Sequence, residues 1–219
     1  MAKRKKITTP LGRARYPWLT EPDTKFDPEG VFRVQLILNA KENEEFLDRL
    51  DAMADEAFED AKEDLKEKKP QDVEKVRRKD PYEYIYDDSG NKTKKVFVKF
   101  KMNHIITTDS GKIELEPDLF DAKGKYIDLD DFNVTGGSEI RVNFTPRKYY
   151  MASNKLAGIS LQLNAVQIVE LAKRGGDPDY YGFGEEEDGF DVDEEVGGDS
   201  DYETFEEGDD EFDVDEEDF

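Results

Sequence analysis

The amino-acid sequence predicts a mainly β protein, in which a small antiparallel barrel or sandwich carries one inserted amphipathic helix and a disordered acidic C-terminal tail. Three observations lead to this class: short segments of two-residue hydrophobic alternation bounded by glycines, one long segment with three- and four-residue spacing, and an abrupt change of composition near residue 175. An OB-fold, a five-stranded Greek-key barrel, is the commonest small barrel that fits this pattern. Periodicity alone leaves an immunoglobulin-like sandwich open.

Residues 1–30 are predicted to form an extended basic N-terminal arm, because proline, charge and turn signals are frequent there. The barrel domain is expected over residues 31–174, and the tail over 175–219. The first strand of the domain, residues 31–38, alternates apolar with mostly polar side chains and should bury one face.

A helix is expected from about residue 43 to 67. Its apolar residues recur at three- and four-residue steps from Phe46 to Leu65, while its other face is densely charged. Asn43 is a candidate N-cap, and Pro70 ends the helix. The helix should therefore pack on one side only.

Two-residue alternation resumes after Pro81. The pattern predicts strands over 82–86 and 94–102, joined by a turn, and it places residues 146–151 in a loop. Further strand candidates are 112–115, 125–129, 139–145 and 159–171.

The C-terminal segment holds the whole net charge of the chain. Residues 175–219 contain 23 Asp and Glu and no Lys or Arg, which equals the formal net charge of −23 and leaves residues 1–174 neutral. Such a segment cannot bury enough apolar surface to offset chain entropy, so it should be disordered. Its aromatic residues, and the repetition of Phe190–Glu195 as Phe212–Glu217, argue against a role in solubility alone.

Enzymatic signals are scarce. Cysteine is absent, which excludes disulfides and thiolate chemistry and favours the cytoplasm. The basic N-terminus lacks an apolar signal region, and no apolar run could span a bilayer, so we expect a soluble protein without a membrane partner. The single His104 fits a hydrogen-bonded or surface role better than general-base catalysis, and the tail lacks the spacing of an EF-hand. No catalytic residue, cofactor or metal site is predicted.

The solvent faces of the predicted strands combine cations with aromatic rings. In segment 94–102 the apolar residues should point into the core, which places Phe97, Lys99 and Lys101 together outside. Single-stranded nucleic acid requires this combination, because cations track phosphates and rings stack on unpaired bases. The candidate DNA contacts, including those of the arm and the 146–151 loop, are Lys3, Arg15, Trp18, Arg33, Phe97, Lys99, Lys101, Arg141, Arg147, Lys148, Tyr149 and Tyr150.

An ordered set of short motifs runs over the full length of the chain: Met1-Ala-Lys with Leu11-Gly12, Gly30-Val-Phe-Arg-Val, the charged helix, Val134-Thr-Gly-Gly-Ser-Glu-Ile140, Pro146-Arg-Lys-Tyr149, Leu161-Gln-Leu163, Val169-Glu-Leu171-Ala and the final Asp218-Phe219. In these motifs the chain resembles the single-stranded DNA-binding proteins of short-tailed, podovirus-type bacteriophages. Two features depart from the family pattern: Arg147 stands where an aromatic residue is expected, and the tail is longer.

The resemblance implies an OB-fold body that coats single-stranded DNA during phage replication, recombination and repair and promotes annealing. It also implies a homodimer in the cytoplasm of the infected bacterial host, and a tail that recruits the phage DNA polymerase and helicase-primase. Transferred to matching positions, it supports Lys3, Arg33, Lys148 and Tyr149 as DNA contacts. Phe212, Asp218 and Phe219 would belong to the partner-binding tail.

The tail is also predicted to compete with DNA for the basic, aromatic face, since its carboxylates mimic phosphates and its phenylalanines mimic bases. A flexible chain of this length has a reach on the order of 35 to 40 Å, enough to span a small domain. The alternative is an acidic interaction protein, either a DNA mimic or a chaperone of basic proteins. It predicts that residues 1–174 bind no oligonucleotide.

Overall fold

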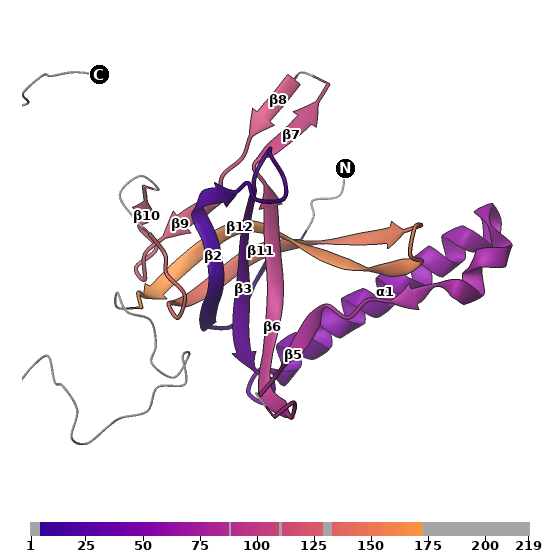
Figure 1. Ribbon diagram of the computed structural model, residues 1–219, viewed down its shortest axis with the longest axis horizontal. Coiled ribbons are helices and arrows are strands. Elements are labelled where there is room, and N and C mark those ends of the chain that lie inside the picture. The colour runs from indigo at the N-terminus through magenta and orange to yellow at the C-terminus, as the bar shows by residue number, and fades with distance from the viewer. Residues whose placement is uncertain (1–4, 88, 110, 129–132, 173–219) are drawn as a thin grey trace, which may run out of the picture. The chain divides into compact units, whose positions relative to one another are not determined.

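Five strands of the described chain close on one another into a barrel (Figure 1). In spatial order they are β2 (Gly12–Asp23), β3 (Val31–Asn39), β6 (Lys92–Asn103), β12 (Leu156–Glu170) and β11 (Glu139–Met151), and β11 pairs again with β2. The β6–β12 pairing is parallel and the others are antiparallel. Numbered along the chain, the order is 1-2-3-5-4-1, which is the Greek-key connectivity of an OB-fold. The predicted fold class is confirmed.

This computed structural model describes residues 5–87, 89–109, 111–128 and 133–172. They belong to one of the two compact units of the chain, Met1–Phe183. The prediction of a disordered tail, and the candidate residues Lys3, Phe212, Asp218 and Phe219, lie outside the described residues.

Alternation along the barrel strands builds the core. Phe32, Val34, Leu36 and Leu38 of β3 are buried, as are every second residue of β6 from Val96 to Met102. Aromatic rings fill the centre: the centroids of Phe100 and Phe144 lie 5.1 Å apart. The inward and outward faces predicted for these strands are confirmed.

Shorter strands extend the barrel at its edges. β7 and β8 form a separate hairpin that projects from it (Figure 1). The short strands are β1 (Ile7–Thr8), β4 (Arg77–Arg78), β5 (Tyr82–Tyr86), β7 (Ile105–Thr108), β8 (Gly111–Glu114), β9 (Asp118–Phe120) and β10 (Tyr126–Ile127).

The predicted N-terminal arm is extended, but much of it belongs to the barrel. β2 pairs with both β3 and β11, so the domain begins well before residue 31. Gly12 permits this pairing, since a Cβ there would lie 2.6 Å from the carbonyl oxygen of Ile37. Two register shifts, one between Arg15 and Trp18, break the two-residue alternation and hid the strand from a pattern search.

The predicted 146–151 loop is also a strand. β11 continues through it to Met151 and stays in register with β12, so the loop shrinks to the turn at 152–155. Pro146 suggested that the strand ends there. In the described part of the chain, however, residues 146–151 of β11 pair only with β12, and their other edge has no partner strand. A proline is tolerated where the ladder does not need its missing N–H.

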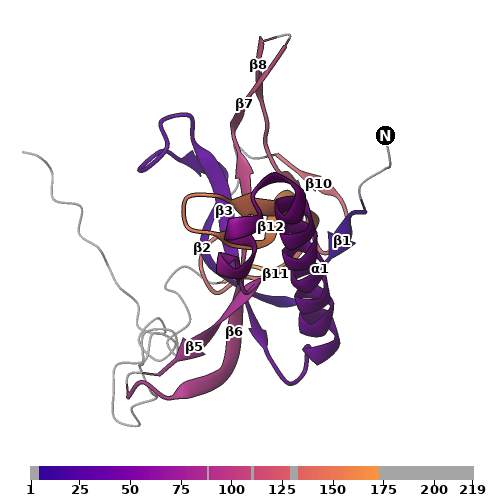
Figure 2. The same ribbon diagram turned by 90° about the vertical axis from the view of Figure 1, so that its right-hand side faces the viewer.

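The predicted helix is present as α1 (Glu44–Lys68), followed by a 3-10 helix, η1 (Pro70–Lys75). Asn43 is the N-cap residue but does not cap with its side chain, which instead donates a 2.9 Å hydrogen bond to the carbonyl of Asn39. Leu47, Leu50 and Ala54 pack against the barrel core. The second half of the helix lies along the β11–β12 hairpin (Figure 2).

An ion-pair cluster fastens the segment after η1 to the helix. Arg78 forms ion pairs with Asp51 and Asp55 of α1 and with Asp80. The Tyr82 hydroxyl donates a 2.7 Å hydrogen bond to Asp51, and burial together with this carboxylate raises the pKa of Tyr82. The helix therefore fixes residues 78–83 beside β6.

The alternation of β6 gives a first prediction. Phe100→Ala should lower the free energy of unfolding by about 3 to 5 kcal/mol, because it leaves a cavity in the core. Phe97→Ala, on the outer face of the same strand, should cost less than about 1 kcal/mol through lost cation–π contacts. Denaturant unfolding of both variants measures the difference, and equal losses would contradict the assigned faces.

The Arg78 cluster gives a second prediction. Tyr82→Phe should destabilise the protein by on the order of 1 to 3 kcal/mol, because Asp51 loses a charge-assisted hydrogen bond. Tyr86→Phe is the control, since Tyr86 lies on the same strand and is 61% exposed. Thermal and denaturant unfolding would show the two variants equally stable if the Tyr82–Asp51 bond contributed nothing.

Candidate nucleic-acid interface

Cations and rings lie in cross-strand rows on the outer face of β2, β3 and β6. The register aligns Trp18, Arg33 and Lys101 in one row, and Arg15, Gln35 and Lys99 in the next. A third row joins Arg13, Ile37 and Phe97. Because neighbouring strands are about 4.8 Å apart, each row presents its side chains side by side.

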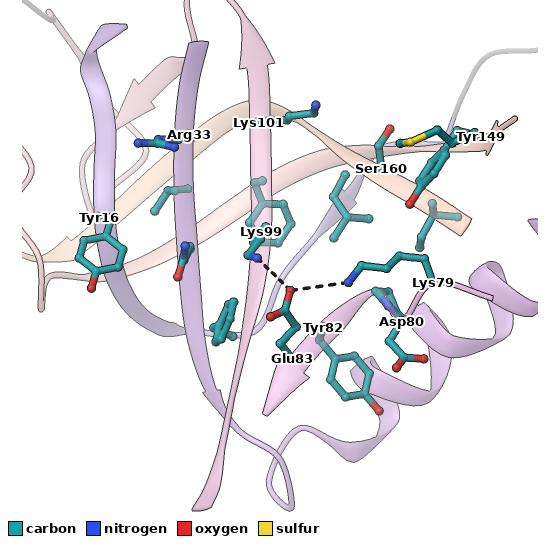
Figure 3. Close-up of a pocket in the computed structure, with 18 residues that line it drawn as sticks. Tyr16, Arg33, Lys79, Asp80, Tyr82, Glu83, Lys99, Lys101, Tyr149 and Ser160 are labelled. Carbon is teal, nitrogen blue, oxygen red and sulfur yellow. Dashed lines mark hydrogen bonds and ion pairs between the residues drawn. The ribbon is translucent and has the colours of Figure 1, made fainter. Parts of the chain in front are cut away.

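This face continues into a groove of about 790 Å³ (Figure 3). Its floor is the outer face of β3 and β6, one wall is the segment Lys79–Glu83, and the other is Tyr149 and Met151 of β11 with residues 159–161 of β12. The lining residues are Tyr16, Arg33, Val34, Gln35, Lys79, Asp80, Pro81, Tyr82, Glu83, Phe97, Lys99, Phe100, Lys101, Tyr149, Met151, Ile159, Ser160 and Leu161.

Most cations of the groove have acidic partners within the protein. Arg33 forms an ion pair with the buried Asp23. Lys99 lies 2.8 Å from Glu83, and Lys79 lies 3.9 Å from the same carboxylate oxygen. Lys101 is exposed and forms no ion pair with any described residue. The cations that line the groove outnumber its carboxylates, and most of these cations form ion pairs with carboxylates of the protein.

Aromatic rings flank these cations. The Arg15 guanidinium lies 4.8 Å from the ring centroid of Tyr16 and 5.6 Å from that of Phe97. The Lys99 ammonium lies 5.1 Å from the Phe97 centroid. Tyr16 has a positive φ of 50° in the irregular part of β2. Tyr16 is 49% exposed and Trp18 is 40% exposed, so both rings can reach a ligand.

Seven predicted site residues come together here. Arg33, Phe97, Lys99, Lys101 and Tyr149 line the groove, and Arg15 and Trp18 stand beside it on β2. Burial raises the pKa of the Tyr149 phenol.

The other described candidates lie elsewhere. Neighbouring residues of a strand face opposite sides, so Lys148 and Tyr150 face α1 while Tyr149 faces the groove. Lys148 lies 2.7 Å from Glu56 and 2.6 Å from Asp60, and these carboxylates raise its pKa. Arg141 points outward, as expected, but pairs with Gln167 on another side of the barrel. Arg147 is exposed on the same side of β11 as Tyr149, opposite Ser160, but is not among the residues that line the groove.

Sequence reasoning missed several residues of this region. Lys79 and Glu83 enter the groove only because the Arg78 cluster holds their segment beside β6. Phe26, in the β2–β3 loop outside the groove lining, is 80% exposed and has the Lys25 ammonium 5.3 Å from its ring centroid. An aromatic residue next to a lysine was the available signal for Phe26. No local signal marks Lys79 or Glu83.

The described residues include no group of three or more His, Cys, Asp or Glu arranged to hold a metal ion. His104 is partly buried: its Nδ1 lies 3.1 Å from the carbonyl oxygen of Leu115, and its ring meets Phe32 edge-on at 5.5 Å. This is the hydrogen-bonded role expected for it. Of the helices in the described ranges, none has the length and apolar character needed to cross a membrane.

The chain is similar in sequence to known single-stranded DNA-binding proteins. Residues 11–171 match the family model described as single-stranded DNA-binding protein of bacteriophage T7. The single-stranded DNA-binding protein of Enterobacteria phage T3 is 30% identical over 202 residues, with 85% of each chain covered. That of Escherichia phage T7 is 29% identical over 205 residues, covering 87% of this chain and 86% of its own.

Solved structures share the fold of this chain. The crystal structure of gp2.5, a single-stranded DNA-binding protein encoded by bacteriophage T7, matches with a TM-score of 0.64 and 26% identity, covering 87% of this chain and 100% of that one. The single-stranded DNA-binding protein of bacteriophage Enc34, solved in complex with single-stranded DNA, shares the fold with a TM-score of 0.51 and 13% identity, covering 78% of this chain and 89% of its own.

The matched segment spans the whole barrel, from the start of β2 to the end of β12. The family consists of binding proteins and not of enzymes, as the lack of catalytic motifs predicted. The chain belongs to the family of bacteriophage T7-type single-stranded DNA-binding proteins.

Proposed function

We propose that the outer face of β2, β3 and β6, with its adjoining groove, binds single-stranded DNA. The observation that carries the proposal is the alignment of cations and rings in rows across three paired strands. The family of the chain, whose named relatives bind single-stranded DNA, supports it. In OB-folds generally, the same face of the second and third strands binds oligonucleotides.

The chemistry of the face suits an unpaired strand. Lys101 and the neighbouring cations attract phosphates, while Phe97, Tyr16 and Trp18 offer rings for bases to stack on. A duplex keeps its bases stacked inside, so it could use only the cations. Binding should therefore favour single strands, and stacking should add affinity largely without sequence preference.

The wider role that we propose is to coat single-stranded DNA during phage replication, recombination and repair, and to promote annealing. We further propose that the protein acts as a homodimer in the cytoplasm of the infected bacterium. The acidic residues 175–219 would recruit the phage DNA polymerase and helicase-primase and compete with DNA for the face. Family membership and the aromatic, uniformly acidic composition of the tail support these roles.

A binding measurement tests the face directly. Phe97→Ala should weaken binding to a single-stranded oligonucleotide by roughly 5- to 100-fold through lost stacking, while Lys101→Ala should reduce the salt slope by about 0.7. Lys125→Ala is the matched control, since Lys125 is also exposed but lies outside the groove. Fluorescence anisotropy over a salt series gives both quantities. Equal effects of the two lysine substitutions would contradict the assignment.

Deleting residues 176–219 tests the proposed tail. The shortened protein should bind single-stranded DNA more tightly and gain affinity more steeply as salt falls, because a tethered polyanion no longer competes. Mobility assays with single- and double-stranded oligonucleotides at two salt concentrations measure this. Unchanged affinity at both concentrations would exclude competition. Failure of the shortened protein to bind any oligonucleotide would favour the acidic interaction protein instead.

A further inference from the structure

One carboxylate stands between two lysines in the groove. Glu83 of β5 accepts a 2.8 Å hydrogen bond from Lys99 of β6, and its Oε1 atom also lies 3.9 Å from the ammonium of Lys79 (Figure 3). All three side chains line the groove. No other acidic residue in the described ranges forms an ion pair with either lysine.

Two ammonium groups around one oxyanion, on a concave surface, form the simplest phosphate site that lysines can make. We propose that Lys79 and Lys99 bind a backbone phosphate of single-stranded DNA, and that the Glu83 carboxylate occupies this phosphate position in the free protein. This inference rests on the proposed function, and it names two residues, Lys79 and Glu83, that composition and motifs did not indicate.

The exchange of carboxylate for phosphate is physically inexpensive. The Lys99–Glu83 pair is roughly half exposed on each side, and exposed ion pairs of this kind contribute only about 0 to 1 kcal/mol. A backbone phosphate brings the same single negative charge, shared by two oxygens as in the carboxylate. The Glu83 side chain can rotate away, although its backbone cannot move, because Glu83 is paired with Phe97 in the β5–β6 ladder.

A displaced Glu83 still leaves its negative charge at the groove. The hydrogen bond from Lys99 lowers the pKa of Glu83. The carboxylate is therefore ionised at neutral pH, where it competes with the phosphate for the two lysines. The two positive charges of Lys79 and Lys99 therefore attract a phosphate, and the negative charge of Glu83 repels it. Glu83 should limit the affinity for DNA and weaken its dependence on salt.

The test replaces Glu83 with glutamine, which keeps the shape and removes the charge. Glu83→Gln should bind a single-stranded oligonucleotide about 3- to 10-fold more tightly at low salt, with a salt slope steeper by up to about 0.7. The matched control is Glu29→Gln, because Glu29 forms a similar exposed pair with Lys112, at 2.7 Å, outside the groove lining. The control removes the same charge and should change affinity much less.

A double variant tests whether Lys79 takes part in the site together with Lys99. Lys79→Ala in the Glu83→Gln background should remove most of the gain, and thermal unfolding should show all variants folded. Equal gains for Glu83→Gln and Glu29→Gln, or weaker binding by Glu83→Gln, would overturn the phosphate position while leaving the proposed function intact. If the unmodified protein bound no single-stranded DNA at all, the proposed function itself would fail.

Discussion

The pairing of β3 with β6 is the constraint on which the rest of the structure depends. The two strands stay in register over nine residue pairs, from Val31–Asn103 to Asn39–Lys95, without a bulge. Since one face of this ladder carries Phe32 and Phe100 into the core, the other face must present every second residue to solvent. A slip of one strand by one residue would bury either Arg33 or Lys99 and expose the core residues of that strand, so folding and the outer face of cations and rings are specified by the same alternation.

The helix inserted between β3 and β6 has a second role besides covering the barrel. Through Asp51 and Asp55 it holds Arg78, and through Asp51 it holds Tyr82. These contacts turn the segment before β5 into a wall of the groove and bring its charged side chains toward the sheet. The β11–β12 hairpin supplies the opposite wall, and its far side is tied to the same helix by Lys148. One helix therefore positions both walls.

The sequence could predict the fold and the outward faces of β3 and β6 because alternation in residues 31–38 and 94–102 is regular. It could not show that Tyr149 and Lys148 face opposite sides of β11, because Pro146 suggested a loop. Only a strand places neighbouring side chains on opposite sides. The role of β2 was hidden by irregular register around Tyr16. The groove residues Lys79 and Glu83 depend on contacts between residues 23 to 31 positions apart, which no local pattern reveals.

The most direct test of the account is to locate the DNA on the protein. Single-stranded oligonucleotides carrying 5-iodo-deoxyuridine can be photo-crosslinked to the full-length protein, and the attached residues identified by mass spectrometry. We predict adducts on the rings beside the groove, Phe97, Tyr16, Trp18 or Tyr149. Tyr86 and Tyr126 serve as internal controls, since they are 61% and 57% exposed but lie off this face. Adducts confined to those two tyrosines would contradict the account.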